Sequence, residues 1–289
     1  MQPGACIAGM RVLIIQENGR HEENRHFREC FSLQKSLKKF GIGAEVWGLG
    51  HSSYDKEIDF NSYDVIINLE NYDTGWVPNL LDASAPKKLI WNIDAHCTGF
   101  EKCMQTFTQG NYDLILQATK DFIQENSVWF PNCYDDSLFY ETPCEEKEHT
   151  LGFCGSLLNR AQLLDFLEKE HSLKKDIWVL GDAMVKAVGS YWMHFNINLA
   201  NDINYRSFET LGCGTALVTN RNYQYGMLGF EDEKNCIMYG DIDELKEKLS
   251  KYSKNKNKLK EIIEGGRVLA REHTYDVRSA TLIEVLSTL

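Results

Sequence analysis

Short apolar runs alternate with amphipathic segments along the first half of the chain. RVLIIQ (residues 11–16) is a continuous apolar run with charged flanks, a pattern typical of a strand buried in a parallel sheet. HFRECFSLQKSLKKFG has apolar residues at helical spacing and stops at Gly41, so we predict a helix there. Further strands are predicted at 44–50, 63–70, 87–94, 112–119 and 127–132. This alternation favours an open parallel sheet covered by helices on both faces.

The alternation stops at residues 134–149 and then restarts. YDDSLFYETPCEEKEH contains a proline and a run of charges without apolar periodicity, so we interpret 134–149 as an interdomain linker. We therefore predict two α/β domains, 10–133 and 150–274, and a C-terminal helix over 275–289 that is a candidate to pack back on the first domain. In the second domain the predicted strands are 150–156, 176–181, 195–200, 215–220 and 235–240.

Composition narrows the classes of protein that fit this plan. The 289 residues carry a net charge of −11, which disfavours non-specific binding to nucleic acids. The nine cysteines are an odd number without a CxxC pair, which indicates reduced thiols in a cytoplasmic protein rather than disulfides or a zinc site. No apolar run reaches the roughly 18 residues of a membrane span, and the first residues do not resemble a signal peptide.

Candidate chemistry follows the predicted strands, because ligands of such folds gather at the carboxyl ends of the strands. His21 follows the first strand, and Asp94 and His96 follow the fourth. Histidine is the side chain best suited to act as a general base near neutral pH. An ordinary role as loop histidines explains both of them equally well at this point.

The second half offers two further candidates. Gly155 and Ser156 are predicted to open a helix, where N–H groups and the helix dipole attract phosphate, and Arg160 lies just beyond them. Strand–glycine–helix junctions are also common simple turns. Glu209 lies on a predicted helix just before Gly212, where it is either part of a ligand site or of a solvated face. The fingerprints GxGxxG and GxxxxGKS are both absent.

Four segments in order resemble one known family. They are LGFCGSLLNRAQLL, NINLANDINYRSFETLGCGTALVTN, NCIMYGDIDELKEKLSKY and GGRVLAREHTYDVRSATLIEVL. They resemble the nucleotide-sugar-binding half of GT-B glycosyltransferases, especially the spore-maturation-type enzymes near the family 4 retaining group. VWFPNCYDDSLF resembles the segment by which such enzymes leave their first domain. The resemblance covers residues 127–285 well and 10–126 only through the order of elements. It implies two Rossmann-like domains facing a central cleft.

The resemblance also implies roles for residues of the second domain. Glu209 occupies the position of a carboxylate that accepts hydrogen bonds from the two vicinal hydroxyls of a ribose. Gly155, Ser156 and Arg160 occupy the phosphate-binding positions. Arg206 is placed to contact the diphosphate, where an arginine and N–H groups stabilise the charge that develops on the leaving group.

One position departs from the family pattern. Many relatives have an acidic residue eight positions before the equivalent of Glu209, whereas this sequence has Asn201 there, with Asp202 beside it. The contact with the donor sugar is therefore lost or is made by Asp202.

The first domain is expected to hold the acceptor. By resemblance His96 touches the donor sugar or deprotonates the acceptor hydroxyl, with His21 as the other candidate and Asp94 beside His96. General-base catalysis of this kind is typically worth about 10²–10⁴-fold. The resemblance implies retention of configuration.

These expectations combine into one function and two alternatives. The chain is expected to move a hexose from a nucleoside-diphosphate sugar, UDP-glucose first, to a hydroxyl acceptor without a metal or other cofactor. The acceptor stays open among a glycan, a protein, a metabolite and a modified DNA base, and the net charge argues against DNA. The alternatives are a non-catalytic nucleotide-sugar or glycan-binding relative and a nucleotide-sugar epimerase of similar fold.

Overall fold

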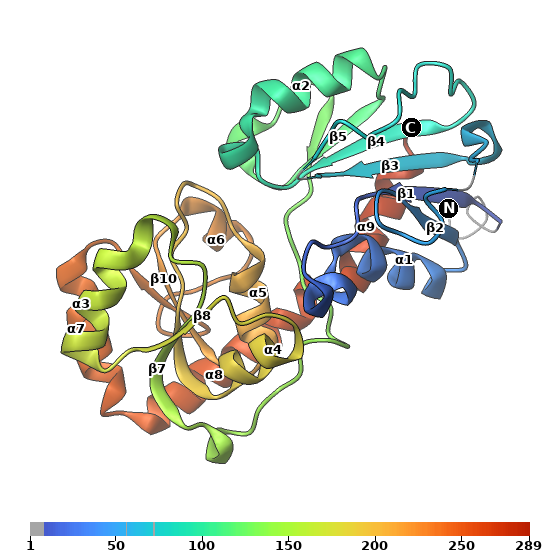
Figure 1. The fold of residues 1–289 in the computed structure, drawn as a ribbon. Helices are drawn as coiled ribbons and strands as arrows, with labels where there is room; N and C mark the ends of the chain where they lie inside the picture. The colour runs from blue at the N-terminus through green and yellow to red at the C-terminus, as the bar shows by residue number, and fades with distance from the viewer. Residues whose placement is uncertain (1–8, 56, 72) are drawn as a thin grey trace. The chain divides into compact units, whose positions relative to one another are not determined.

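The computed structural model describes residues 9–55, 57–71 and 73–289. It divides into two compact units, one formed by the chain up to residue 132 together with 275–289, and the other by residues 133–274 (Figure 1). Each unit contains one sheet whose paired strands all run parallel. The predicted α/β class with two parallel sheets is therefore confirmed. Among the described residues, no helix has the length and apolar character needed to cross a membrane.

The sheet of the first unit has the strand order β2-β1-β3-β4-β5-β6. Its central strands consist of buried residues, as their apolar runs predict. The strands are β1 (Arg11–Ile15), β2 (Gly43–Trp47), β3 (Val65–Leu69), β4 (Lys87–Asn92), β5 (Leu114–Gln117) and β6 (Ser127–Trp129).

Three α-helices cover this sheet: α1 (Glu29–Lys39), α2 (Phe100–Gln109) and α9 (Tyr275–Leu286). α1 and α9 pack on one face, and α2 lies on the other (Figure 1). The C-terminal helix is attached at its start, where Ser36 donates a hydrogen bond to the Tyr275 carbonyl (3.0 Å) and Lys39 pairs with Asp276 (2.7 Å). Short helical turns are η1 (Glu22–Phe27), η2 (Phe60–Ser62), η3 (Ala95–Gly99) and η4 (Lys120–Phe122).

The second unit is built around a sheet of order β11-β10-β9-β7-β8. One apolar cluster of this unit joins buried side chains from β7, β9, β10, α3, α7 and α8, and further buried apolar side chains such as Val188 of α4 and Phe208 of α5 lie outside it. The strands are β7 (His149–Gly155), β8 (Lys174–Ile177), β9 (Tyr191–Phe195), β10 (Ala216–Asn220) and β11 (Ile237–Tyr239). The helices are α3 (Ala161–His171), α4 (Gly181–Gly189), α5 (Tyr205–Gly212), α6 (Tyr223–Met227), α7 (Ile242–Ser253) and α8 (Lys256–Ala270), with short turns η5 (Cys144–Glu146), η6 (Leu158–Arg160) and η7 (Arg271–His273).

Two strands of this unit occupy other residues than predicted. β9 is formed by YWMHF, before the apolar residues at 195–200, and it contains the buried His194. The residues after Phe195 form a loop because their asparagines are engaged in hydrogen bonds rather than in the sheet. β8 begins at Lys174 and ends at Ile177, and as an edge strand with mostly half-buried residues it lacks a clear apolar run. Gly181 then starts α4 instead of ending a strand.

Candidate functional site

Two loops of the second unit meet at the carboxyl edge of its sheet. β7 ends at Gly155 and β9 ends at Phe195, and the two strands are neighbours. Arg160 joins the loops that follow them, because its guanidinium donates hydrogen bonds to the carbonyls of Ser156 (3.4 Å) and Ile197 (3.3 Å). The structure thus brings Gly155, Ser156 and Arg160 to one edge, where ligands bind in doubly wound sheets.

The helix after Gly155 begins later than the sequence predicts. β7 extends through Gly155, the short turn η6 starts at Leu158, and α3 starts only at Ala161. Leu158 has a φ of 35°, in the left-handed region, as the chain reverses direction. The prediction that Gly155 and Ser156 open a helix is therefore wrong. They belong to a strand-to-helix loop, and the start of α3 lies beyond them.

Arg206 and Glu209 form an ion pair on α5. The guanidinium Nη1 lies 3.0 Å from Oε2 of the carboxylate, and their side chains are only 21% and 15% exposed. Spacing of three residues places both on one face of the helix. Burial lowers the pKa of the Arg206 guanidinium, but the charge of Glu209, together with nearby thiol and phenol groups, raises that pKa above its ordinary value. Glu209 is therefore not a solvated residue on an outer face.

The ion pair lies within electrostatic range of the loop after β7. Burial raises the pKa of the Cys154 thiol to about 11, and the charges of Arg206 and Glu209 both act on that thiol. Cys154 immediately precedes Gly155. The candidate phosphate loop and the candidate ribose carboxylate thus belong to one region of the second unit.

A buried histidine connects these two parts. The Cys154 N–H donates to His194 Nε2 (3.2 Å), so that nitrogen carries no proton. His194 Nδ1–H then donates to the Thr210 hydroxyl (2.7 Å), which donates to the Arg206 carbonyl. Burial, reinforced by the Arg206 charge, holds the pKa of His194 well below its ordinary value, so the ring is neutral. This series of hydrogen bonds fixes α5 against β7. No motif in the sequence indicates that His194 has this role.

A second polar network supports the loop between β9 and α5. The Tyr225 hydroxyl, fully buried, makes hydrogen bonds with Asn198 (2.8 Å), Ser207 (2.8 Å) and Thr219 (3.0 Å). Such a buried network holds its members in one arrangement. The backbone of this loop also carries Asp202, which is buried and accepts a hydrogen bond from the Ala200 N–H (3.2 Å). A role of Asp202 toward a donor sugar stays a prediction.

The first unit places the other predicted residues at the carboxyl edge of its own sheet. His21 is exposed and follows β1 at the start of η1, whereas Asp94 and His96 follow β4, with the half-buried His96 inside η3. β3 lies between β1 and β4, which separates the two strand ends by about 10 Å. The two histidines thus lie on the same edge but follow different strands.

Glu70 organises the loop that carries Asp94 and His96, and the sequence analysis did not identify it. Its Oε2 accepts hydrogen bonds from the N–H groups of Ile93 (2.9 Å) and Asp94 (2.7 Å). The sequence shows only that this carboxylate directly follows the run VIINL, which does not by itself indicate its role. No group of three His, Cys, Asp or Glu side chains suited to a metal ion occurs in the described part of the chain.

Comparisons with known proteins identify the class. Residues 155–284 match a family described as glycosyl transferase-like. Similar solved structures include HepE of Anabaena in complex with UDP and glucose (TM-score 0.63, 13% identity, 97% of this chain and 100% of that chain). An α-glucosyltransferase in complex with UDP and a 13-mer DNA has a TM-score of 0.71 at 11% identity, over 98% of this chain and 100% of that one.

The chain has the GT-B fold, and its residues 155–284 belong to a glycosyl transferase-like family. This confirms the resemblance stated from the sequence. The same fold occurs in the sucrose-phosphate synthase of Thermosynechococcus elongatus, with a TM-score of 0.62 and 10% identity over 96% of this chain and 98% of that chain. No curated protein sequence matches this chain. The family match includes Gly155, Ser156, Arg160, Arg206 and Glu209.

Proposed function

We propose that this glycosyltransferase moves a hexose from a UDP-sugar, UDP-glucose being the first candidate, to a hydroxyl acceptor. The observation that carries the proposal is the partly buried Arg206–Glu209 pair beside the loop after β7, within the half that matches the family. Both HepE and the α-glucosyltransferase are described in complex with UDP, which supports uridine as the nucleoside of the donor.

In the proposed mode of binding, the loop after β7 receives the diphosphate. N–H groups of Gly155 and Ser156, together with Arg160 and Arg206, stabilise the negative charge that grows on the leaving diphosphate. The carboxylate of Glu209 accepts hydrogen bonds from the ribose hydroxyls, since its two oxygens suit two vicinal donors. The protein groups thus supply the stabilisation, and the proposal requires neither a metal nor another cofactor.

The reacting end is assigned to the first unit. We propose His96 as the residue that orients the donor sugar or accepts the acceptor proton, with His21 as the alternative and Asp94 as its neighbour. Glu70 supports this assignment because it holds the backbone at Ile93 and Asp94, directly before His96. Retention of configuration is proposed on the resemblance alone.

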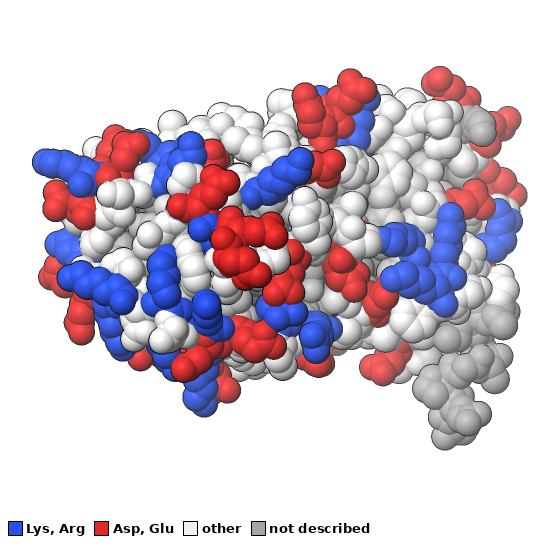
Figure 2. Space-filling view, turned by 90° about the horizontal axis from the view of Figure 1, so that it is seen from below, with Lys and Arg blue, Asp and Glu red and all other residues white. Residues whose placement is uncertain are grey.

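A DNA acceptor is disfavoured for this chain, although the α-glucosyltransferase was described with DNA. The net charge of −11 repels a polyanion, and Figure 2 shows acidic side chains interspersed with basic ones over the face in view. A glycan, a protein or a metabolite hydroxyl agrees better with this surface. The free thiols of the eight described cysteines support the proposal that the enzyme acts in the reducing cytoplasm.

A donor screen tests the proposal. UDP, GDP and ADP would be compared for thermal stabilisation of the full chain, and UDP-glucose, UDP-galactose and UDP-N-acetylglucosamine for release of UDP with and without an array of acceptor glycans. We expect UDP to bind best, and UDP release to increase only when acceptor is present and to persist in EDTA. Binding without turnover would instead support the non-catalytic alternative, and conversion of the sugar without acceptor would support an epimerase.

A further inference from the structure

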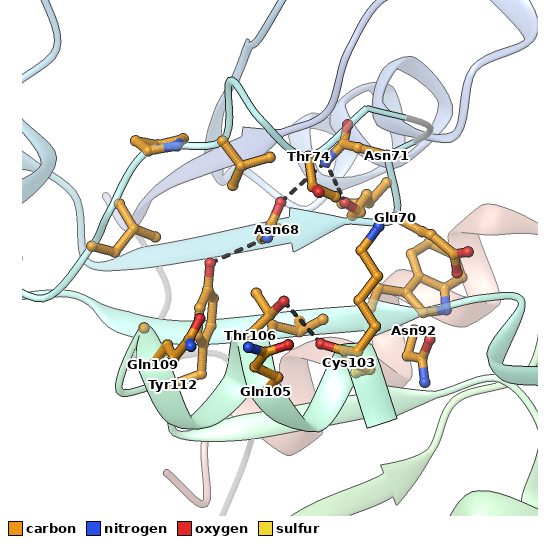
Figure 3. Close-up of a pocket in the computed structure, with 18 of the residues that line it drawn as sticks. Asn68, Glu70, Asn71, Thr74, Asn92, Cys103, Gln105, Thr106, Gln109 and Tyr112 are labelled. Carbon is orange, nitrogen blue, oxygen red and sulfur yellow. Dashed lines mark hydrogen bonds between the residues drawn. The ribbon is translucent and has the colours of Figure 1, made fainter. Parts of the chain in front are cut away.

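The first unit contains a polar pocket between its sheet and α2 (Figure 3). Its volume is about 430 Å³, within the range of about 300–1,000 Å³ that is typical of small-molecule sites. Six primary amides line it: Asn68, Asn71, Asn79, Asn92, Gln105 and Gln109. So many amides beneath a covering helix are unusual, because a sheet face normally packs apolar side chains against its helix.

The polar character belongs to one face of the sheet. Successive residues of a strand point to opposite faces, so Asn68 of β3 shares a face with Asn92 of β4, and Glu70 follows directly after β3. The opposite face is apolar, with Trp91 packed edge to face against Tyr275 of α9. The face of Asn68 and Asn92 also carries Ile66 and Ile90 of an apolar cluster, so its amides lie among apolar side chains, where polar groups are costly unless they are hydrogen-bonded.

The pocket walls are held in place by internal hydrogen bonds. Asn68 donates to the Tyr112 hydroxyl (3.2 Å) and accepts from Asn71 (3.3 Å), as Figure 3 shows. Buried Lys88 donates to the carbonyls of Leu80 (3.0 Å) and Gly110 (3.3 Å), which belong to two different walls. The site is therefore pre-organised, which lowers the entropic cost of binding a ligand.

α2 supplies the remaining wall and does not close the pocket. None of its ten residues is fully buried, and Cys103, Gln105, Thr106 and Gln109 line the pocket opposite β3 and β4 (Figure 3). The Tyr112 hydroxyl accepts from Asn68 and keeps its own proton to donate; burial raises the pKa of Tyr112 to about 12, so this phenol is neutral. The lining thus offers both donors and acceptors.

This chemistry selects one class of ligand. The charged lining residues are one carboxylate, Glu70, and one ammonium, Lys102, so the lining has no net charge to attract an anion. Leu80, Ile90 and Tyr112 also line the pocket, and such apolar groups suit the C–H face of a sugar ring. Gln105 and Gln109 are exposed residues of α2 that line the pocket, and each of their amides can both donate to and accept from a ligand hydroxyl. Neutral hydroxyls, which both donate and accept, remain as the complement.

We infer that this pocket binds one uncharged pyranose unit of the acceptor. The inference rests on the proposed function, and it assigns to the acceptor a neutral sugar rather than a phosphate, a peptide or a base. β4 supports the link with transfer, because Asn92 lines the pocket only two residues before Asp94 and four before His96.

Two threonines of α2 give a matched pair of variants for the test. Thr106 lines the pocket and Thr108 is exposed, and each hydroxyl donates to the carbonyl four residues earlier at 3.0 Å. Thr106→Phe fills the pocket, whereas Thr108→Phe makes the same change outside it. D-Glucose, D-galactose, D-mannose and N-acetyl-D-glucosamine would be titrated into the full chain by ligand-observed NMR, and UDP by calorimetry.

At least one of these sugars should bind the wild-type chain and Thr108→Phe equally, and bind Thr106→Phe at least ~10-fold more weakly, with the Kd of UDP equal in all three. Gln109→Leu, which removes an amide without adding bulk, should weaken the sugar by about 3- to 10-fold and serves if Thr106→Phe fails to fold. Sugar affinity that is insensitive to Thr106→Phe and Gln109→Leu, or binding of inorganic phosphate but of none of the sugars, would overturn the inference. Pocket-dependent sugar binding without any UDP binding would instead refute the proposed function and leave the pocket assignment in place.

Discussion

Substituting Glu209 by glutamine tests the proposed ribose contact directly. Glutamine keeps the size of the side chain and one acceptor oxygen, but replaces the second oxygen by an NH₂ group that cannot accept a hydrogen bond. One charge-assisted hydrogen bond to a ribose hydroxyl is then lost, which is worth about 1.5–3 kcal/mol. The Kd of UDP should therefore rise by about 10- to 150-fold, since about 1.4 kcal/mol corresponds to a factor of ten.

The same substitution also removes the counterion of Arg206, and this second effect must be separated from the first. The pair is 3.0 Å apart and its side chains are only 21% and 15% exposed, so the unpaired guanidinium destabilises the fold. Losing one partner of a fully buried pair costs roughly 3–5 kcal/mol. We expect roughly 1–3 kcal/mol here, because solvent reaches both groups.

A chemical cycle separates the two effects. UDP and 2′,3′-dideoxy-UDP would be titrated by calorimetry into the wild-type chain and Glu209→Gln, with unfolding in urea measured in parallel. If the carboxylate binds the ribose, the substitution weakens UDP but leaves the dideoxy compound nearly unaffected. An equal loss for both ligands would mean that Glu209 acts only by holding Arg206, and no loss for either would remove the ribose from this part of the unit.

Three further predictions concern residues around the same sheet. Burial lowers the pKa of Lys147 to about 8, so the unfolded chain binds more protons than the folded chain between pH 8 and 10.5, and stability rises with pH in that window. The unfolding free energy of the wild-type chain, measured in urea relative to Lys147→Met, should therefore increase by about 1 kcal/mol from pH 7 to 9, and a difference between the two chains that does not change with pH would contradict this. Burial holds the pKa of His194 below its ordinary 6.5, so the contribution of this histidine to stability is complete above pH 6.5 and is lost as the pH falls below that value. His194→Leu should lower the unfolding free energy at pH 7.5 by about 2–4 kcal/mol, because two hydrogen-bonding groups lose their partner. This difference from the wild-type chain should shrink toward pH 5. Arg160→Ala should reduce kcat for glycosyl transfer by at least ~10-fold. It should shift Tm little, because the two hydrogen bonds from Arg160 to backbone carbonyls are long, at 3.3 and 3.4 Å. A large loss of Tm with unchanged kcat would show a purely structural role.

The sequence predicted elements best where a strand is apolar throughout. β1, β3 and β10 were located to within two residues because RVLII, VIINL and ALVTN are buried almost along their whole length. β9 was misplaced because its run includes His194, whose polar ring is satisfied only by partners from β7 and α5. Periodicity cannot reveal such partners, since they are far apart in the sequence.

The same limit applies to the functional residues. Arg206 and Glu209 were assigned through the family motif, which contains both, whereas their three-residue spacing alone indicates only that they share a helical face. Glu70 and the amide pocket could not be found, because their meaning depends on which face of β3 lies under α2. An asparagine inside VIINL was the available signal, and a single polar residue in an apolar run does not say whether it meets a partner or a ligand.

The ion pair on α5 also explains why the diphosphate and the ribose should bind together. Arg206 is the counterion of Glu209 in the structure, so a ligand that engages only the guanidinium leaves a poorly solvated carboxylate behind, at a cost. A ligand that engages only the carboxylate likewise leaves a poorly solvated guanidinium without its counterion. In the proposed mode of binding, a nucleoside diphosphate satisfies both groups at once, with its diphosphate on Arg206 and its ribose hydroxyls hydrogen-bonded to Glu209. We therefore expect selectivity for a nucleoside diphosphate over free pyrophosphate or a free nucleoside, because the two opposite charges lie three residues apart on one helical face.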